Sequence, residues 1–395
     1  MQRTIRFPLL PTHEQQLVLL DTLHQYTACF NKVAAFGWEK GVKNSIELHK
    51  GTYYPLRENF PTLPSQLVIS ARMKAAEAVK SALTWKKKRA KEHASKVAKA
   101  LAHKKPVPKF KPVHCPHSSM MTIRYDKRSY TIHEDCVSLA TIQGRQVIEL
   151  HFYTYALRLL QQCTGFDSAD LVYRRGRFWL HLVVTLPDVK YIPNGESIGA
   201  DFGITHPIVA SNNLFFGQRH WKGTERRYFR LRRALQSKGT KSAKRHLKKL
   251  SGRMARFRTD CDHVVSRKLV QSVVPGTTIV IEDLTDIRST IKQSTKPQRR
   301  AMHQWSFRRL AALLAYKAAA HGCAVVGVDP RHTSQACSRC GNVHSSNRLS
   351  RSHFKCHNCG FELHADLNAS RNLARKQPAS LGISEAGGLL STSLL

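Results

Sequence analysis

Three acidic residues stand where a carboxylate could hold a metal ion. Asp201 ends the apolar run SIGAD, Glu282 ends the run TIVIE, and Asp366 precedes a helical segment. A carboxylate at the end of an apolar strand is costly to bury unless it is paired or binds a metal. Each acid alone is equally well explained as a capped or salt-bridged structural residue. Together, Asp–Glu–Asp from two strands and a helix start is an arrangement that binds two Mg²⁺ ions for phosphodiester hydrolysis, one activating water and the other stabilising the leaving oxygen.

The neighbours of these acids allow two further predictions. Asp283 follows Glu282 directly, so it should point to the opposite face of the strand and be structural. Gly199 and Gly203 flank Asp201 and carry no side chains. We therefore predict that they leave room for a phosphate backbone to approach Asp201.

Four cysteines predict a structural zinc site. Two Cys-x-x-Cys pairs with 15 residues between them have the spacing of a zinc ribbon, and each pair is followed by a glycine that permits a tight turn. Four thiolates leave no open position for water, so this zinc is not expected to be catalytic. Four nearby histidines are either surface residues or phosphate contacts. The cysteines are Cys337, Cys340, Cys356 and Cys359, and the histidines are His344, His353, His357 and His364.

The charge balance indicates a polyanionic partner. The chain has 395 residues with 64 Lys+Arg against 26 Asp+Glu, a formal net charge of +38 and a pI near 10.3. The excess is spread along the chain, which favours nucleic acid over an acidic membrane surface. No apolar run is long enough to be a membrane span or a signal core. The six remaining cysteines show no pairing pattern, so we expect a soluble protein of a reducing, cytoplasmic compartment: Cys29, Cys115, Cys136, Cys163, Cys261 and Cys323.

The first half of the chain predicts a sheet with a helical insertion. Residues 3–10 are predicted to form a strand that Pro11 ends. Thr12 is predicted to be the N-cap of a helix over 13–40. Residues 51–64 are predicted to be irregular, and a second helix is expected from 65 to about 85. Residues 86–111 hold 11 Lys/Arg and one acid, which favours phosphate contact over a merely solvated face. From 119 to 188 the period is two, as in a small antiparallel sheet or barrel that residues 3–10 could join as its first strand. Aromatic residues alternate there with basic ones (Tyr125, Tyr130, Phe178), which suits a nucleic-acid-binding face or a core equally well.

The second half predicts an α/β unit. Buried strands are expected around Asp201, at 277–284 and at 323–330, with helices at 302–320 and from Asp366 to about 376. Residues 226–258 contain 14 Lys/Arg and no acid at helical spacing, so we interpret them as an insertion of two basic helices. The tail 377–395 is predicted to be disordered.

Here the sequence resembles a known family. IGADFGI, IVIEDL and HADLNASRN resemble the three motifs of a RuvC-type nuclease with an RNase H-like fold. Their order, the basic insertion, and the cysteine segment TSQACSRCG…SSNR…FKCHNCGFELHADLNASRNL resemble the transposon-encoded TnpB proteins, relatives of the type V CRISPR effectors. The likeness covers roughly residues 196–376, whereas the N-terminal part matches only in layout.

The resemblance implies an α/β multidomain nuclease with the following parts. A β-rich, barrel-like wedge domain would comprise 1–11 and 105–192, with a helical recognition domain at 12–104. A RuvC-like nuclease domain would comprise 193–334 and 362–376, with the zinc ribbon at 335–361 and the tail at 377–395.

The resemblance also assigns roles to residues. Asp201, Glu282 and Asp366 would be the catalytic ligands of two Mg²⁺ ions, and the four cysteines would bind one Zn²⁺. Arg348 stands where the family has an arginine that assists the nuclease site; a role as a surface residue is the alternative. Asn368 and Asn372 would orient backbone or phosphate near Asp366 or lie on the helix surface. Candidates for contacts with nucleic acid are Tyr53, Ser70 and Lys74, for a short DNA motif, and Arg226, Arg227 and Arg230 on the basic helices.

These features predict a magnesium-dependent, RNA-guided DNA endonuclease whose partners are a guide RNA and double-stranded target DNA. We expect a monomer with one guide in the prokaryotic cytoplasm, associated with the nucleoid. A miniature type V CRISPR effector has the same chemistry and remains an alternative. A non-cleaving RNA-guided repressor should lack one of the acids, and a plain DNA transposase with a zinc ribbon does not readily explain so extensive a basic surface.

Overall fold

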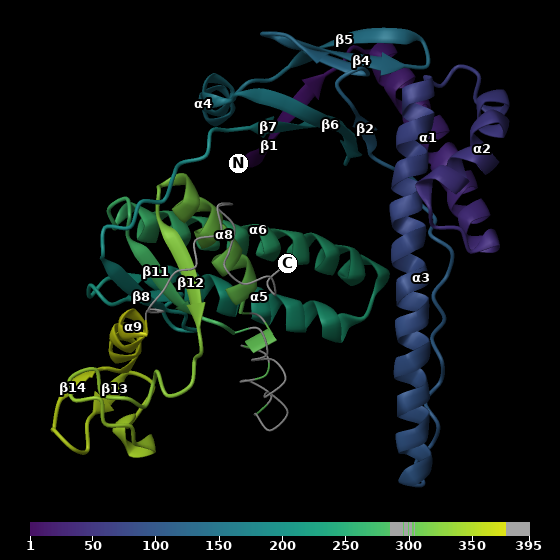
Figure 1. Cartoon of the computed structure of the whole chain (residues 1–395). Helices are drawn as coiled ribbons and strands as arrows, with labels where there is room; N and C mark the ends of the chain where they lie inside the picture. Colours follow the sequence, from purple (N-terminus) through teal and green to yellow (C-terminus); the bar gives the residue numbers. More distant parts are fainter. Residues whose placement is uncertain (285–294, 296–298, 300–301, 304, 377–395) are drawn as a thin grey trace. The chain divides into compact units, whose positions relative to one another are not determined.

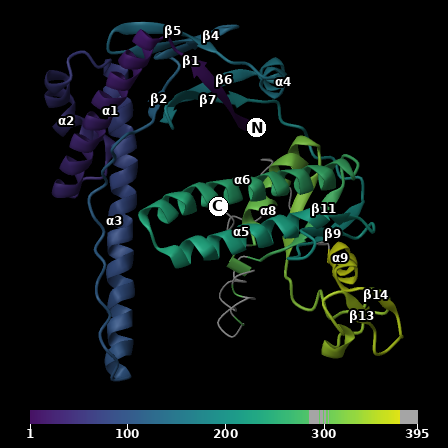
Figure 2. The ribbon, with the colours of Figure 1, turned by 180° about the vertical axis from the view of Figure 1, so that it is seen from behind.

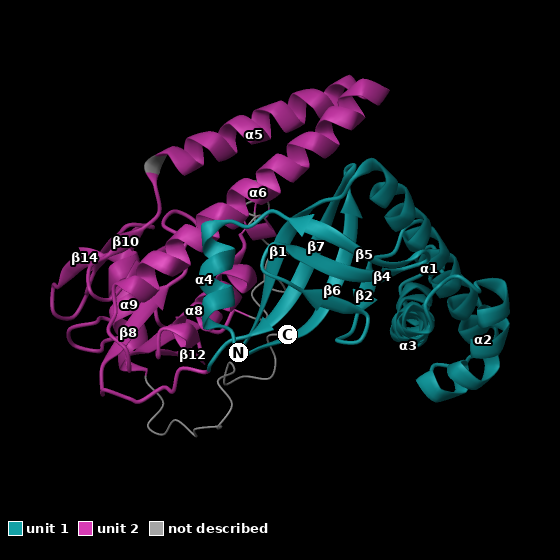
Figure 3. Ribbon diagram, turned by 90° about the horizontal axis from the view of Figure 1, so that it is seen from above, with its two compact units in different colours: residues 1–187 teal, residues 188–395 magenta. Residues whose placement is uncertain are grey.

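Two units, each with its own hydrophobic core, make up the chain. The computed structural model describes residues 1–284, 295, 299, 302–303 and 305–376 (Figure 1). The units comprise residues 1–187 and 188–395 (Figure 3). The predicted tail 377–395 lies outside the described residues. Across the described part, no helix combines the length and apolar character that crossing a bilayer requires.

A seven-stranded antiparallel sheet forms the framework of unit 1, in the order β2-β6-β7-β1-β5-β4-β3. Its strands are β1 (Gln2–Leu10), β2 (Ile123–Tyr125), β3 (Tyr130–Ile132), β4 (Cys136–Thr141), β5 (Gly144–Leu150), β6 (Gly165–Arg174) and β7 (Arg177–Thr185), with α4 (Thr154–Gln162) between β5 and β6. β1 pairs with both β7 and β5. The prediction that the first strand joins this sheet, with helices inserted after it, is therefore confirmed.

Three helices form the insertion: α1 (His13–Lys40), α2 (Ser45–Asn59) and α3 (Ser65–Ala102). Thr12 caps α1 in a capping box with Gln15, as expected for an N-cap threonine. The prediction that 51–64 is irregular was wrong for 51–59. The Asn44 side chain caps α2, and Leu48, Thr52 and Leu56, four residues apart, bury one face, which outweighs the cost of Pro55 in the helix.

α3 is longer than predicted and continues from about residue 85 to Ala102. Its last 17 residues are mostly Lys, Arg and Ala, which favour helix without needing a packed face. The segment that follows runs back beside the helix (Figures 1 and 2), where His93 contacts the carbonyl oxygen of Pro108 at 2.8 Å and the Phe110 ring at 5.0 Å between centroids. The basic run 86–111 thus consists of the second half of α3 and part of the irregular segment that runs back beside it.

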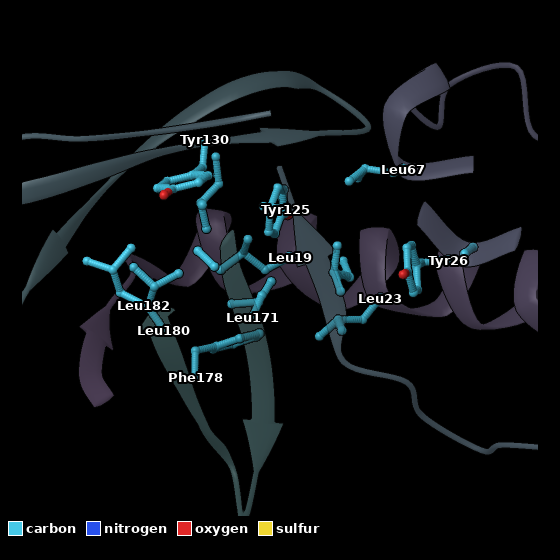
Figure 4. Close-up of a cluster of buried hydrophobic side chains, with 14 of the residues drawn as sticks. Leu19, Leu23, Tyr26, Leu67, Tyr125, Tyr130, Leu171, Phe178, Leu180 and Leu182 are labelled. Atoms are coloured by element: carbon cyan, nitrogen blue, oxygen red, sulfur yellow. The ribbon is translucent and has the colours of Figure 1, made fainter. Parts of the chain in front are cut away.

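The core of unit 1 joins the helices to the sheet (Figure 4). Leu19, Leu23 and Tyr26 of α1 pack with residues of β6 and β7, among them Leu171 and Leu180. Tyr125, Tyr130 and Phe178 are all buried in this cluster. The alternation of aromatic and basic residues therefore belongs to a core, with the aromatics inside.

Unit 2 is built on a five-stranded mixed sheet in the order β10-β9-β8-β11-β12. The strands are β8 (Ser197–Asp201), β9 (Ile208–Ala210), β10 (Phe215–Phe216), β11 (Thr278–Glu282) and β12 (Ala324–Val328). β8, β11 and β12 run parallel, while β9 and β10 are antiparallel additions beside β8. The three predicted buried strands are confirmed as the parallel part of the sheet.

The helices of unit 2 are α5 (Arg219–Lys238), α6 (Lys241–Gln271), α8 (Phe307–Ala320) and α9 (Ala365–Arg375). α5 and α6 form a hairpin (Figure 2), which confirms the two predicted basic helices between β10 and β11. Only the end of α6 enters the core, through Val265, Leu269 and Val270. The cysteine segment adds a 3-10 turn, η2 (Ser345–Asn347), and a hairpin of β13 (His353–Lys355) and β14 (Glu362–His364) beside α9.

Candidate functional site

Two of the predicted acids lie side by side at one edge of the unit 2 sheet. Asp201 is the last residue of β8 and Glu282 the last residue of β11. The strands are parallel and Ile281 pairs with Ala200, so the next residue of each strand is the acid. Because the carboxyl ends of parallel strands meet at one edge, strand register alone brings these two carboxylates together.

The third acid reaches the same edge on a helix that crosses the sheet very closely. Asp366 lies in the first turn of α9, and α9 packs on β8. A Cβ atom at Gly199 would lie 1.8 Å from the Ser370 carbonyl oxygen and 2.6 Å from the Ala374 nitrogen. The prediction that Gly199 makes room for phosphate was therefore wrong, because its missing side chain makes room for α9. Gly203 lies at the site itself, since a Cβ there would be 3.8 Å from Asp366 Oδ2 and 2.6 Å from the His206 carbonyl oxygen.

An open pocket of about 1030 Å³ contains all three carboxylates. The loop after β8, the loop after β12 and the cysteine segment supply its other walls. Its lining includes Asp201, Glu282 and Asp366 together with Arg348, Arg351, Arg331, His206, His364, Thr333 and Trp305. The structure thus brings the predicted acids and Arg348 into a single pocket.

The pocket carries an excess of negative charge. Burial, followed by the neighbouring Glu282 and Asp366, raises the pKa of Asp201 well above its ordinary value, while Arg348 acts to lower it. Burial also raises the pKa of Glu282, which a hydrogen bond from Thr333 opposes. Removal from water penalises the charged forms of Asp201 and Glu282, and repulsion adds to this at Asp201, so cations would stabilise the charged forms. Clustered carboxylate oxygens are the ligand type that Mg²⁺ takes, and the donor set therefore fits that ion.

Arg348 supplies one positive charge to the pocket. Its guanidinium donates to Asp366 Oδ1 at 3.1 Å and to the Arg351 carbonyl oxygen at 3.2 Å. It follows η2 and forms an isolated β-bridge with Phe354, whose side chain is fully buried. The segment that carries the cysteines therefore also holds Arg348 beside Asp366.

The four cysteines form a compact cluster. Their sulfur atoms all lie within 4.8 Å of one another, with Cys337 and Cys359 at 3.7 Å and Cys340 and Cys356 at 3.6 Å. Tetrahedral zinc with Zn–S bonds of about 2.3 Å would separate its sulfurs by roughly 3.8 Å, so the cluster fits zinc. Gly341 and Gly360 adopt φ angles of +78° and +69°, as the predicted tight turns require. In the described part of the chain this is the one group of at least three possible ligands so closely spaced.

The histidines near the cysteines divide between surface and pocket. His344 and His357 stack with a ring-centroid distance of 5.6 Å, and His353 lies 3.5 Å from the Glu362 carboxylate. His364 instead lines the pocket, 6.0 Å from the His206 ring. Of the four, only His364 is placed among the acids.

The residues proposed to read a DNA motif lie in unit 1 with much of their polar capacity already used. Ser70 donates to the Arg124 carbonyl oxygen at 2.7 Å and shares a hydrogen bond with Tyr26. The Lys74 ammonium is buried and donates to the Thr122 carbonyl oxygen and hydroxyl, both at 2.8 Å. Tyr53 is half-buried and stacks on His49 at 4.6 Å. Any DNA contact by Ser70 or Lys74 would compete with these bonds.

The other candidates for nucleic-acid contact are exposed to solvent. Arg226, Arg227 and Arg230 lie on α5 with exposed side chains. From His220 to Lys238, α5 buries no side chain fully, and its basic residues there mostly face solvent. Such a helix offers charge to a phosphate backbone without first losing internal contacts.

Thr333 and His206 are among the pocket residues that sequence reasoning missed. Thr333 follows β12 and donates from its hydroxyl to Glu282 Oε1 at 2.6 Å. A usable signal existed, because β12 is the third parallel strand and its carboxyl end must also meet this edge. His206, in the loop after β8, had no such signal, since its position depends on contacts with Phe215 and His364.

The matches of this chain to a family model and to curated proteins agree with one another. Residues 307–373 match the model of the Cas12f1-like TNB domain family. The chain is 38% identical over 130 residues to the CRISPR-associated endodeoxyribonuclease Cas12f1 of Sulfoacidibacillus thermotolerans, covering 32% of this chain and 29% of that protein. It is 35% identical over 133 residues to the TnpB-like protein MJ0751 of Methanocaldococcus jannaschii, covering 33% of this chain and 46% of that protein. It is 28% identical over 211 residues to InsQ of Escherichia coli, a protein named as a putative RNA-guided DNA endonuclease, covering 49% and 52%.

Solved structures extend the likeness in fold. CasPhi-2 (Cas12j) bound to crRNA matches 95% of this chain and 98% of its own with a TM-score of 0.54 at 12% identity. The mini-RNA-guided endonuclease CRISPR-Cas_phi3 matches 95% and 92% with a TM-score of 0.50 at 11% identity.

In fold this chain is similar to CasPhi-2 (Cas12j), and in sequence it is similar to the CRISPR-associated endodeoxyribonuclease Cas12f1. More particularly, it is a relative of the TnpB and Cas12f1 proteins, as the motifs predicted. The sequence matches span between 29% and 52% of the curated relatives just named.

Proposed function

We propose that the protein is an RNA-guided DNA endonuclease that hydrolyses phosphodiester bonds with two Mg²⁺ ions. The observation that carries the proposal is the convergence of Asp201, Glu282 and Asp366 on one pocket. Relatives named as RNA-guided or CRISPR-associated DNA endonucleases support it. All three acids being present favours cleavage over a role as a non-cleaving repressor.

The residues of this chain would divide the work as follows. The three carboxylates would hold the Mg²⁺ ions, which when bound activate water and stabilise the leaving oxygen. Arg348 would balance charge at Asp366 and contact the phosphate being cleaved.

We infer that unit 2 is an RNase H-like nuclease domain formed by 193–334 and 362–376. Its mixed sheet, with two acids at the ends of neighbouring parallel strands, supports this assignment. The zinc element, residues 335–361, would be an insertion that holds Arg348. Residues 12–104 of unit 1 would form the helical recognition domain, and residues 1–11 and 105–192 the wedge, whose last residues, 188–192, belong to unit 2.

The structural zinc has its own test. Elemental analysis should find one zinc per chain, and Cys356→Ser should lower that content and the stability of the region around Asp366. The partly exposed Cys163, which lies in unit 1, provides a matched control as Cys163→Ser, which should keep the zinc. A wild-type protein without bound zinc would contradict the assignment.

The nucleic-acid part of the proposal rests on charge. The net charge of +38 and the exposed arginines of α5 would hold a guide RNA, and its duplex with target DNA, through their phosphates. We propose one guide RNA per monomer and a place in the prokaryotic cytoplasm near the nucleoid. Binding should weaken steeply as salt rises.

The deciding experiment starts from the full chain purified from cells. RNA that co-purifies should be a defined species, and its sequence separates a transposon end from a CRISPR array. Removing the RNA should abolish cleavage of matching DNA, and adding it back with Mg²⁺ should restore it. Equal cleavage by RNA-free protein would overturn the guided mechanism and favour a plain DNA nuclease or transposase.

A further inference from the structure

Glu282 is bonded to a loop that enters the pocket from the next strand. Thr333 lies in the loop of residues 329–338, which follows β12 and includes the first residues of the zinc element, and its side chain is 2% exposed. Its hydroxyl lies 2.6 Å from Glu282 Oε1 and 2.9 Å from the Pro330 carbonyl oxygen. A hydroxyl has one proton, and the charged, closer carboxylate is the stronger acceptor. The bond therefore fixes the orientation of the Glu282 carboxylate.

The same loop is held by the helix that carries Asp366. Asn372 donates to the carbonyl oxygens of Thr333 at 2.9 Å and Ala336 at 2.7 Å. Asn368 donates to Ala336 at 2.7 Å and accepts from the Ser338 backbone N–H at 2.9 Å. Both asparagines are buried, so they orient backbone and do not lie on the helix surface.

The end of α9 adds a further connection. Lys376 donates to the carbonyl oxygens of Asp329 at 3.0 Å and Arg331 at 2.6 Å. α9 thus bonds the 329–338 loop at five backbone positions, from Asp329 to Ser338. Two of the candidate metal-binding acids, Asp366 on the helix and Glu282 on β11, are consequently linked through one loop.

We propose that Thr333 is a positioning residue for Glu282, and that Asn368 and Asn372 fix the loop so that Glu282 and Asp366 keep one geometry. The inference rests on the proposed function, because it assigns these residues to the metal site. Partners that hold a ligating carboxylate commonly change metal affinity or activity by about 10- to 100-fold when removed. A merely structural hydrogen bond would instead affect folding and leave affinity in the folded protein unchanged.

Thr333→Val tests the inference, since it removes the hydroxyl at nearly constant volume, and Thr333→Ser should rescue it. The matched control is Thr278→Val, which removes a buried hydroxyl at the other end of the same strand as Glu282, where it bonds Tyr191 at 2.7 Å. Mn²⁺ binding to RNA-free, full-length protein is followed by electron paramagnetic resonance. Glu282→Gln sets the background from sites elsewhere.

We expect Thr333→Val to weaken the Mn²⁺ affinity by about 10-fold or more. Thr333→Ser and Thr278→Val should remain close to wild type, and thermal denaturation should show all variants folded at the assay temperature. The Mg²⁺ needed for half-maximal cleavage should rise in parallel for Thr333→Val.

Two results would overturn the inference. One is wild-type Mn²⁺ affinity in folded Thr333→Val, and the other is an equal loss in Thr278→Val. If wild type binds Mn²⁺ but does not cut guide-matched DNA, the proposed function fails. The comparison of Mn²⁺ affinities between wild type and Thr333→Val would still test the inference. A wild-type protein with no Mn²⁺ binding above the Glu282→Gln background would overturn both.

Discussion

Two clusters of charged side chains, one in each unit, are built on opposite principles. In unit 1, Lys74 and Arg124 lie within 3.7 Å of Asp170, and Arg124 lies 3.5 Å from Glu77. Two cations thus face two acids, and the one buried member, Lys74, also bonds Thr122. Every charge in this cluster has an opposite charge beside it.

The cluster in unit 2 leaves its charge unbalanced. Asp201, Glu282 and Asp366 share a pocket in which, among the described residues, Arg348 is the one cation that bonds a member of the triad. Burial is the largest cause of the raised pKa of Asp201, and both other acids act in the same direction. A cluster whose charges have opposite charges beside them needs no further partner, whereas surplus acid in a pocket is unfavourable and a bound cation would relieve it. The difference supports the proposal that the metal ions bind in unit 2.

The largest effect should come from Asp201→Ala. Cleavage of guide-matched DNA with Mg²⁺ should fall by at least about 10³-fold, corresponding to about 4 kcal/mol, because a metal ligand is lost. RNA and target binding should remain near wild type in gel-shift assays, and the melting temperature should not decrease, because repulsion is relieved. Wild-type cleavage by this variant would show that the unit 2 acids are structural like those of unit 1.

Gly199→Ala should test how closely the acids depend on the packing of α9. The added methyl group would collide with the Ser370 carbonyl oxygen, so α9 must shift, at a cost of about 3 kcal/mol in the free energy of unfolding. Mn²⁺ affinity should fall with it, because Asp366 moves. Gly223→Ala is the control: that glycine lies on α5 with open space around it, and alanine there should stabilise the helix by about 0.5–1 kcal/mol. Unchanged stability and metal affinity in Gly199→Ala would contradict this packing.

Lys74→Met should distinguish a structural role of Lys74 from a role in DNA contact. Methionine keeps the apolar stem but leaves the Thr122 carbonyl without its donor, so unit 1 should lose about 2 kcal/mol in urea denaturation. Mn²⁺ binding in unit 2 should not change. If stability is kept while binding to target DNA is lost, Lys74 contacts DNA, and the balanced cluster is not structural.

The smallest effect should be a difference in pH dependence. The pKa of Asp201 is raised in the folded state, so the folded chain binds more protons than the unfolded one. Stability from this group is full below its unfolded pKa, about 3.9, and is lost as pH rises toward the folded value. In metal-free protein the free energy of unfolding should therefore fall with pH more steeply than in Asp201→Asn, by at most about 1.4 kcal/mol per pH unit. Saturating Mg²⁺ should remove the difference, and identical slopes without metal would argue against a strained carboxylate.

Much of the candidate site was predictable because its signals are local. Asp201 and Glu282 end strands whose apolar runs are readable in sequence, and the cysteine spacing directly encodes a zinc cluster. The same local rules predicted α1 to the residue, through Thr12 and Pro11. They failed at α2, where Pro55 and Gly51 suggested a break and packing against neighbouring helices decided otherwise.

The sequence by itself determined which chemistry is available: carboxylates at strand ends, four thiolates in ribbon spacing, and basic helices for phosphate. Only the tertiary structure decided how those groups are held. Thr333 bonds Glu282 across 51 residues of sequence, and Gly199 meets α9, more than 170 residues away. Lys74 turns inward for the same kind of reason, since its partners are Thr122, just before β2, and Asp170 of β6. Side-chain chemistry is a property of each residue, whereas hydrogen-bond partners are set by packing between distant segments, which no local pattern encodes.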